Sequence, residues 1–579
     1  MEERWFTDFE PSPRWPHYTR GNAGEVLPTP ASPLGQKLTF EMGLIQGGAV
    51  GSCRTGLYEM EEYDSELPET WGFFGSYLYI NLSNIRMQGV RNPAITVEQL
   101  DAAFFGEQAD VPSYSPHRDD EKPHLLPAIE AHTNWVLSCT EWPELIETRD
   151  RVTEVRQNRP ALADISDTEL VARAREMIPW IRHTYDQHYV ASSSAGIAPG
   201  ILGVVGEAVG DPTIPMRVLA GMGGVDSAQS SFAVWELSRG VRSSPVLTAA
   251  FDEGVGGVLD RLADTGEGQA FLQDWAGFID LYGARGPNEY EISGPSFETH
   301  PHIAFAALDL ARFQDDDQSP SRRSAVLAEQ RVATVEAVRA KLAELGDAAL
   351  AGMFEGGLIG GNMMMFRERT KTNFVRVNHE IRVAARELGR RHHRAGNVGD
   401  PDEIFMLVET ELDDFVADPA AFTETLSQRM DEWRALWDLE PPFFIRDGHV
   451  PPPSQWARRG EREVAPAQPG EVLPGVSGSP GTVIGRARIV LDSGQPGDLE
   501  PGDILVAPRT DSAWGPLFMA LAGVVVNVGA GFSHAAIVSR ELGLPCAVSV
   551  TDATDRIPDG ALIELNGATG QVTILEHPS

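Results

Sequence analysis

The apolar pattern of this chain changes its period at a proline- and glycine-rich segment, residues 451–475 ("PPPSQWARRGEREVAPAQPGEVLPG"). Before this segment, from about residue 130 to 440, apolar residues recur at three- and four-residue spacing, which is typical of amphipathic helices. After it come short apolar runs such as "GDILVAP" and "GVVVNVG", which are typical of strands. The change predicts a multidomain α+β protein. We expect a large, mostly helical domain over 1–450, a linker over 451–475 and a small α/β domain over 476–579.

The small domain has clear signals for its helices. Two are expected, near 513–522 and over 534–542. For the second, Ser533 can cap the start, Gly543 marks the end and Pro545 lies just beyond. The final run "GALIELNGATGQVTIL" predicts a hairpin. The first 100 or so residues mix glycine-rich loops with short apolar runs and allow no assignment of elements.

Composition limits the possible partners and the compartment. The 579 residues exceed what one compact core normally contains. The formal charge of -37 disfavours nucleic acid and anionic membrane as partners. Three cysteines far apart in sequence fit neither a disulfide framework nor a zinc site, and no metal site is expected. No signal peptide or apolar run long enough for a membrane span is evident. The sequence therefore predicts a soluble cytoplasmic protein.

His534 lies where a glycine-rich loop becomes a helix, in "VVVNVGAGFSHAAIVSRELGLPCAV". If Ser533 is the cap, His534 is the first helical residue, beside backbone N–H groups that have no partner within the helix. These groups attract anions, and the helix dipole favours a neutral, nucleophilic imidazole. Gly529 and Gly531 would leave room for a phosphoryl group. The alternative is that His534 only packs at the start of the helix.

Three segments of the small domain resemble the swivelling phosphohistidine domain of the PEP-utilising enzymes. They are "GVSGSPGTVIGRARIV", "GDILVAPRTDSAWGPLFMALAGVVVNVG" and "GFSHAAIVSRELGLPCAV". That family includes pyruvate phosphate dikinase, PEP synthase and rifampin phosphotransferase. Its histidine takes a phosphoryl group from ATP or PEP at one site and delivers it at another. The resemblance implies that His534 is this histidine. The residues that it implies for phosphoryl binding are Gly529, Gly531, Ser533, Arg540 and Lys371.

The chain departs from the family pattern in three places. Ala530 stands where a second adjacent glycine is usual, which narrows the expected phosphoryl pocket without closing it. Phe532 replaces the threonine of the dikinases and PEP synthases, so regulation through that threonine is not expected. Only 45 residues follow His534, too few for the PEP-pyruvate barrel, so chemistry on PEP or pyruvate is not expected either.

Four further segments resemble the acceptor-binding part of rifampin phosphotransferase and occur in the same order: 19–34, 281–292, 367–371 and 399–412. In the second segment the family's Gly-His-Arg-Gly has Ala284 in place of histidine. The resemblance implies catalytic roles for Arg285, Glu289, Glu291 and Arg367.

Further basic residues, Arg382, Arg386 and Arg390, continue a stripe at four-residue spacing from the third segment. The stripe could receive the phosphorylated domain. The alternative is a solvated helix face paired with Glu368, Glu380 and Glu387.

No ATP-grasp domain and no glycine-rich nucleotide loop is evident upstream of the acceptor-like segments. The nearest known arrangement is that of the phenol- and cresol-phosphorylating synthases, in which a separate subunit binds ATP. We therefore expect a separate ATP-grasp subunit that holds ATP and Mg²⁺, and a small apolar or aromatic acceptor with a hydroxyl group. Two alternatives are open: a non-phosphorylating enzyme such as a dehydratase, and a degenerate binding or regulatory protein.

Overall fold

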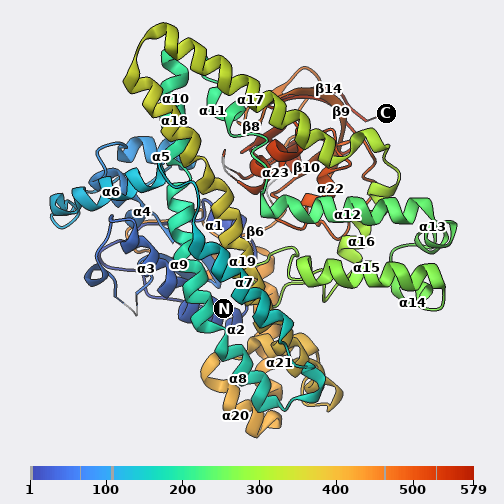
Figure 1. Cartoon of the computed structure of the whole chain (residues 1–579). Coiled ribbons are helices and arrows are strands. Elements are labelled where there is room, and N and C mark those ends of the chain that lie inside the picture. Colours follow the sequence, from blue (N-terminus) through green and yellow to red (C-terminus); the bar gives the residue numbers. More distant parts are fainter. Residues whose placement is uncertain are drawn as a thin grey trace. The chain divides into compact units, whose positions relative to one another are not determined.

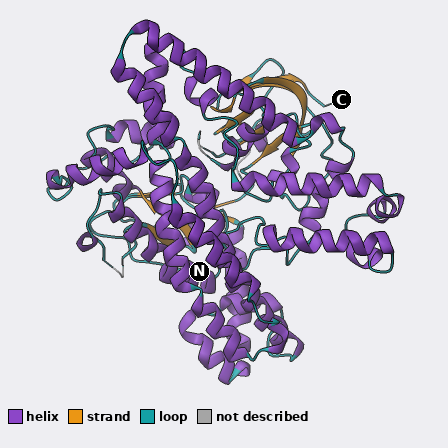
Figure 2. Ribbon diagram, viewed as in Figure 1, coloured by secondary structure: helices purple, strands orange, loops and turns teal. Residues whose placement is uncertain are grey.

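The computed structural model describes residues 4–64, 67–105, 110–461, 464–529, 531 and 533–578. It is a multidomain α+β protein in which helices predominate, as the periodicity predicts (Figure 2). The chain divides into two compact units. Unit 1 comprises 1–197, 290–294 and 362–462, and unit 2 comprises 198–289, 295–361 and 463–579. The predicted boundaries of the acceptor domain and of the swivelling domain stay predictions.

Unit 1 is built around two long helices, α9 (Ile178–Ser194) and α19 (Asn362–Arg394), which pack against each other (Figure 1). The first 100 residues supply a π-helix, Gln36–Ile45, and three strands of an antiparallel sheet in the order β2-β3-β1-β5. The four strands of this sheet are Trp71–Phe74 (β2), Tyr77–Asn81 (β3), Tyr18–Thr19 (β1) and, from much later in the chain, Phe444–Ile445 (β5). The longer remaining helices are α3 (Gln46–Arg54), α4 (Leu82–Arg91), α5 (Val97–Phe105), α6 (Leu126–Val136), α7 (Pro143–Gln157), α8 (Asp167–Glu176), α20 (Leu412–Ala417) and α21 (Thr423–Trp437).

Unit 2 combines helices with an eight-stranded sheet in the order β7-β14-β13-β9-β10-β11-β12-β8. Strands β9 to β12 are parallel neighbours, and β13 and β14 form the predicted hairpin. The strands are Val472–Leu473 (β7), Val476–Ser479 (β8), Thr482–Ile489 (β9), Ile504–Ala507 (β10), Gly523–Val526 (β11), Cys546–Val548 (β12), Leu562–Asn566 (β13) and Gln571–Glu576 (β14). The helices include α10 (Ile197–Val209), α12 (Asp226–Ser243), α13 (Pro245–Asp252), α15 (Gly266–Tyr282), α16 (His302–Arg312), α17 (Pro320–Leu345), α18 (Ala348–Gly360), α22 (Gly515–Phe518), α23 (His534–Leu542) and α24 (Ala553–Arg556).

Both faces of the parallel strands β10, β11 and β12 are buried, which explains their nearly continuous apolar sequences. Leu505, Val524 and Val526 share a core with residues of α12 and α16. Val506 and Val525 point to the opposite face and pack with the hairpin and α24. Alternate residues of each strand thus join the sheet to the helices of unit 2 in one core.

The segment predicted as a linker is attached at both ends. Trp456 packs against Tyr77 of unit 1, and β6 (Ala457–Arg458) pairs with β4 (Leu439–Glu440). At the other end, β7 extends the sheet of unit 2 by pairing with β14. Parts of the predicted linker are thus paired with neighbouring strands, and its role as a linker stays a prediction.

One helical run, Asp167–Val209, is long and apolar enough to cross a membrane by length and composition only. Of its most apolar window, 44% is buried within the protein. One such helix is weak evidence for a membrane span, because core helices of soluble proteins pass the same test. The predicted cytoplasmic location stays a prediction.

Candidate functional site

His534 is the first residue of α23, as predicted, and follows the carboxyl end of the parallel strand β11. Ligands of open α/β sheets bind at this edge. Nδ1 of His534 lies 3.3 Å from Oγ1 of Thr510, in the loop after the neighbouring strand β10. The half-buried imidazole also lies near the ring of Phe518, with a centroid separation of 6.4 Å. Two strand ends therefore meet at this histidine.

The ends of α23 follow the predicted caps in backbone conformation. Ser533 has the extended conformation of an N-cap, with φ -68° and ψ 165°, although its hydroxyl makes no capping hydrogen bond with any described residue. Gly543 ends the helix in the left-handed region at φ 67°, where glycine carries little steric cost. The first-turn N–H groups of α23 are thus not capped by Ser533 and lie next to the imidazole.

The two glycines of the loop differ in their surroundings. A Cβ atom at Gly529 would lie 3.0 Å from Ser533 Oγ and 3.1 Å from Val548 Cβ, so close packing explains this glycine. At Gly531 the nearest atom to such a Cβ is the carbonyl oxygen of Ser477, 4.0 Å away. Gly531, rather than Gly529, borders open space. The departures at Ala530 and Phe532 lie outside the described residues.

Arg540 lies in the last turn of α23 and is buried. Its guanidinium donates a hydrogen bond to the carbonyl oxygen of Gly531. Burial lowers the pKa of Arg540 to about 10, because the charged form loses hydration. Arg540 therefore holds the glycine loop over the start of α23, and its predicted phosphoryl contact stays a prediction.

Arg285 and Glu289 form a buried ion pair in unit 2, with Arg285 Nη1 3.2 Å from Glu289 Oε1. Ser512 joins the pair: its hydroxyl donates to Glu289 Oε2 over 2.8 Å and accepts from Arg285 Nη1 over 3.2 Å. The backbone N–H of Asn288 donates to Asp511. Residues 510 to 512 therefore connect His534 to two of the predicted catalytic residues within one unit.

Glu291, only two residues beyond Glu289, belongs to unit 1. Its carboxylate accepts hydrogen bonds from the N–H groups of Ser32 and Ser293, at 3.0 and 2.9 Å, and from the Ser32 hydroxyl at 2.5 Å. Burial raises the pKa of Glu291. This carboxylate caps the chain before α2 (Pro33–Gly35), for which Ser32 is the N-cap residue.

Arg367 and Lys371 lie one turn apart on α19 in unit 1, both half-buried. Glu368 of the same turn is buried, and its Oε2 atom has no hydrogen-bond partner among the described residues. This oxygen therefore does not make the ion pair with the distal arginines that the alternative of a solvated helix face describes.

The distal arginines of α19 bind the chain segment 290–294. Arg382 is fully buried and donates to the carbonyl oxygen of Glu291 over 3.0 Å. Arg386 donates to the carbonyl oxygens of Ser293 and Gly294 and to the carboxylate of Asp402. Of these three arginines, Arg390 makes an ion pair of the kind that the alternative describes, with Glu387. Arg382 and Arg386 hold unit 1 together instead of forming a solvated face.

His188 of α9, which the sequence analysis did not single out, lies beside residues 367–371 of α19. Its Nδ1 lies 3.0 Å from Thr370 Oγ1, and its Nε2 lies 3.3 Å from the Tyr290 hydroxyl. Burial, followed by the charges of Arg367 and Lys371, lowers the pKa of His188 to about 3. The sequence of α9 shows no spacing between His188 and another site residue that could have indicated this contact.

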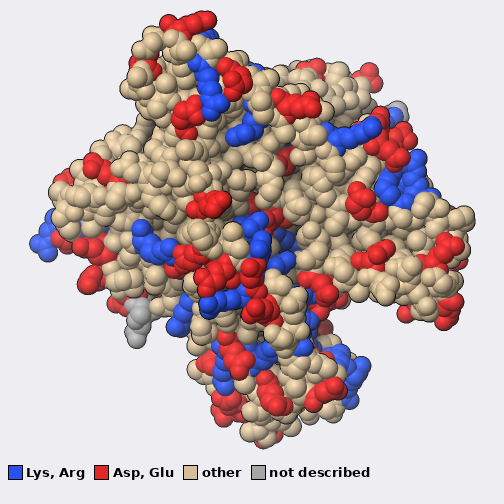
Figure 3. Space-filling view, in the orientation of Figure 1, with Lys and Arg blue, Asp and Glu red and all other residues tan. Residues whose placement is uncertain are grey.

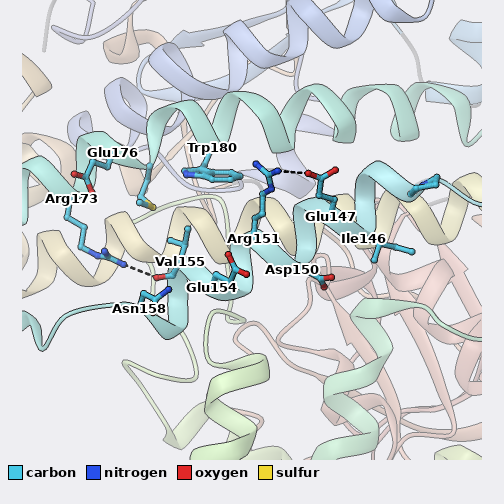
Figure 4. A pocket seen from close by; sticks show the side chains of 12 residues that line it. Ile146, Glu147, Asp150, Arg151, Glu154, Val155, Asn158, Arg173, Glu176 and Trp180 are labelled. Atoms are coloured by element: carbon cyan, nitrogen blue, oxygen red, sulfur yellow. Dashed lines mark hydrogen bonds and ion pairs between the residues drawn. The ribbon is translucent and has the colours of Figure 1, made fainter.

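Two cavities lie apart from these residues. A cavity of about 1310 Å³ in unit 1 lies between α7 and the helices α8 and α9, and its walls include Arg151, Glu147 and Trp180 (Figure 4). A cavity of about 640 Å³ in unit 2 lies between α12 and α15. Neither contains a predicted site residue. On the face shown in Figure 3, acidic and basic side chains are interspersed.

Unit 2 contains a second polar feature where the sheet meets α12. Ser227, Ser230 and Ser231 are fully buried on one face of α12, and their hydroxyls have no partner among the described residues. A Cβ atom at Gly515 of α22 would lie 3.2 Å from Ser231 Oγ. The loop and helix next to His534 therefore rest on an unsatisfied polar face.

Comparison with known families supports the resemblance. Residues 187–358 match the family model described as "Rifampicin phosphotransferase fourth domain", and residues 499–570 match "PEP-utilising enzyme, mobile domain". An uncharacterized protein of Mycobacterium tuberculosis is 33% identical over 353 residues, 61% of this chain and 37% of that protein. A rifampicin phosphotransferase of Streptomyces sviceus is 32% identical over 321 residues, 55% of this chain and 36% of that protein.

A prodigiosin synthesizing transferase of Serratia marcescens is 28% identical over 368 residues, 62% of this chain and 40% of that protein. The matched part thus spans about two fifths or less of the length of these relatives. The mobile-domain match includes His534 and the loop of Thr510, and the fourth-domain match includes Arg285 and Glu289. These matches support a relationship of the chain to the PEP-utilising enzymes, and to the rifampicin phosphotransferases among them.

Proposed function

We propose that this chain carries a phosphoryl group on His534 and transfers it to a hydroxyl group of a small acceptor. The observation that carries the proposal is the position of His534 at the start of α23, inside the mobile-domain match. Because Nδ1 meets Thr510, we assign phosphoryl attachment to the other ring nitrogen, Nε2. The N–H groups of the first turn then stabilise the phosphoryl oxygens.

Two displacements at phosphorus make up the reaction. In the first, Nε2 forms a bond to phosphorus while the bond between phosphorus and the departing oxygen of the donor breaks. In the second, the acceptor oxygen bonds to phosphorus, the N–P bond breaks, and the hydroxyl proton passes to a carboxylate. Catalysis of such transfers rests mainly on positioning and electrostatics.

Glu289 is the carboxylate that we assign to the hydroxyl proton, since Ser512 connects it to the loop that contacts His534. Arg285, its ion-pair partner, supplies positive charge to the phosphoryl group in transit. Arg367 and Lys371 of unit 1 supply the same charge on the acceptor side.

The donor and the acceptor are proposed from the resemblance. ATP and Mg²⁺ would be held by a separate ATP-grasp subunit, and the acceptor would be a small apolar or aromatic molecule such as a phenol. The related proteins named for rifampicin phosphotransfer support a hydroxyl-bearing acceptor. We propose that the protein acts in the cytoplasm, without nucleic acid or membrane as partners.

The test is incubation of the purified chain with ATP, Mg²⁺ and an ATP-grasp protein encoded by a neighbouring gene, followed by intact-mass measurement. We expect the mass of one phosphoryl group, labile to acid and absent in His534→Ala. A folded wild-type chain that never gains this mass would exclude phosphotransfer and leave the dehydratase and binding-protein alternatives.

A further inference from the structure

His188 is enclosed within unit 1 and has polar partners at both ring nitrogens. Thr370, one of these partners, is fully buried in the turn of α19 that also carries Arg367 and Lys371. The other partner, Tyr290, is the first residue of the short segment 290–294 that unit 1 takes from the middle of the sequence. The imidazole thus joins its own helix, α9, to two other segments of unit 1, α19 and 290–294.

The hydrogen bonds define which nitrogen carries the proton. The Thr370 hydroxyl donates to the carbonyl oxygen of Arg367 over 2.9 Å, so its oxygen accepts from His188. Nδ1 is therefore the donor, and Nε2 is the acceptor for the Tyr290 hydroxyl at 3.3 Å and for the Ser192 hydroxyl of the next helical turn at 3.4 Å. The chain of bonds runs from Tyr290 through His188 and Thr370 to the backbone of Arg367.

The surroundings of His188 favour the neutral imidazole, in which Nδ1 donates and Nε2 accepts a hydrogen bond. The two cationic side chains on the same side, Arg367 and Lys371, and the lack of solvent contact both disfavour imidazolium. Tyr290 is itself held by Asn378, which donates to its carbonyl oxygen over 3.0 Å, and by Phe374 at a ring separation of 4.7 Å. Both ends of the chain of bonds are therefore fixed on α19.

We propose that His188 is a positioning residue: as the neutral Nδ1–H tautomer, it holds the Arg367–Lys371 turn of α19 in the orientation that receives an anionic phosphoryl group. The inference rests on the proposed function, because that function assigns the turn to phosphoryl transfer. A role in packing alone would require only the shape of the ring, whereas a positioning role requires the Nδ1 donor.

Binding of inorganic phosphate to the full chain at fixed pH, measured by calorimetry, tests the proposal. We expect Arg367→Ala to abolish binding and His188→Phe, which keeps a ring, to weaken it about tenfold. His188→Asn, whose amide N–H lies near the position of Nδ1, should restore most of the affinity. Thr370→Val should match His188→Phe, Thr370→Ser should resemble wild type, and the two losses should not add in the double variant.

Nitrogen NMR of the imidazole gives a readout that does not depend on binding or activity. The expected spectrum is that of a neutral Nδ1–H ring that does not titrate between pH 5 and 8. Wild-type phosphate affinity in His188→Phe, failure of His188→Asn to restore a lost affinity, or an Nε2–H ring would each overturn the inference. If phosphate binds in the expected pattern but His534 is never phosphorylated, the proposed function fails while the positioning role stands.

Discussion

Thr510 Oγ1 lies 3.3 Å from Nδ1 of His534, and this contact joins the loops that follow two neighbouring parallel strands. Loss of the contact would free the imidazole to rotate and to change its tautomer. Thr510→Val preserves the shape of the side chain and should slow phosphorylation of His534 about tenfold, in line with the net worth of one hydrogen bond. The rate is measured by intact mass after rapid mixing with the ATP-charged partner. Thr510→Ser is the matched control, and an unaltered rate in Thr510→Val would show that Thr510 does not orient the ring.

Glu289 and Glu291 are expected to differ in function although they are two residues apart. Glu289→Gln should leave phosphorylation of His534 intact and slow discharge of the phosphoryl group to phenol by about 10²-fold to 10⁴-fold, the usual effect of a lost general base. Glu291→Gln should chiefly lower the melting temperature, because its carboxylate accepts three buried hydrogen bonds from Ser32 and Ser293. Single-turnover discharge and thermal melts of both variants separate the roles. If instead Glu291→Gln slowed discharge and Glu289→Gln only lowered the melting temperature, Glu291 would be the general base.

The serine face of α12 predicts where the sheet separates from the helices of unit 2. The buried hydroxyls of Ser227, Ser230 and Ser231 have no hydrogen-bond partner among the described residues, which destabilises the closed contact between α12 and α22. Water would hydrogen-bond these hydroxyls when the contact opens, so opening requires little free energy at this place. The combination of Ser231→Cys and Gly515→Cys should form a disulfide, because the two side chains would be in direct contact. We expect the oxidised protein to lose phosphorylation of His534 by the partner and the reduced protein to regain it.

Ser231→Cys alone, oxidised in the same way, controls for the three native cysteines, of which Cys139 and Cys546 are buried. Full phosphorylation of the disulfide-linked protein would mean that His534 can reach its phosphoryl donor while the sheet stays attached to α12.

Glu541 predicts a stability change with pH. This buried carboxyl of α23 accepts hydrogen bonds from the N–H groups of Met222 and Gly223, and burial raises its pKa from 4.5 to about 7. The folded state therefore holds the proton more tightly than the unfolded state, and stability is lost as the pH rises from about 4.5 to about 7. Glu541→Gln should be more stable than wild type at pH 8, by at most about 3 kcal/mol, and equal to it at pH 4.

Melting temperatures of both proteins at the two pH values test this. Asp8, whose pKa burial raises to about 6, gives both proteins the same background pH dependence. An equal difference at pH 4 and pH 8 would show that the carboxyl does not titrate in this range.

Local signals in the sequence predicted the start and end of α23, the hairpin and the alternation between helical and β regions, because caps and apolar periods act over a few residues. They could not predict that Arg285 meets Ser512, which lies 227 residues further along the chain. Nor could they separate Glu289 from Glu291, since the two units divide between residues 289 and 290. Two-residue strands such as β6 and β7 are too short to show a period, so the sequence could not predict that parts of the linker segment pair with other strands.

The interleaving of the two units in the sequence has a consequence for synthesis of the chain. Unit 1 needs α19 and the strand Phe444–Ile445, which the ribosome delivers only after most of the helices of unit 2. Until α19 is synthesised, the first 197 residues cannot complete the core of unit 1, and their apolar surfaces stay exposed. The helices from residue 198 likewise cannot complete their core until the C-terminal sheet is synthesised. Sequential folding of one domain after another is not open to such a chain, and many of its native contacts join distant residues. We therefore expect chaperones to bind the chain during translation and truncated fragments to be recovered poorly as folded protein.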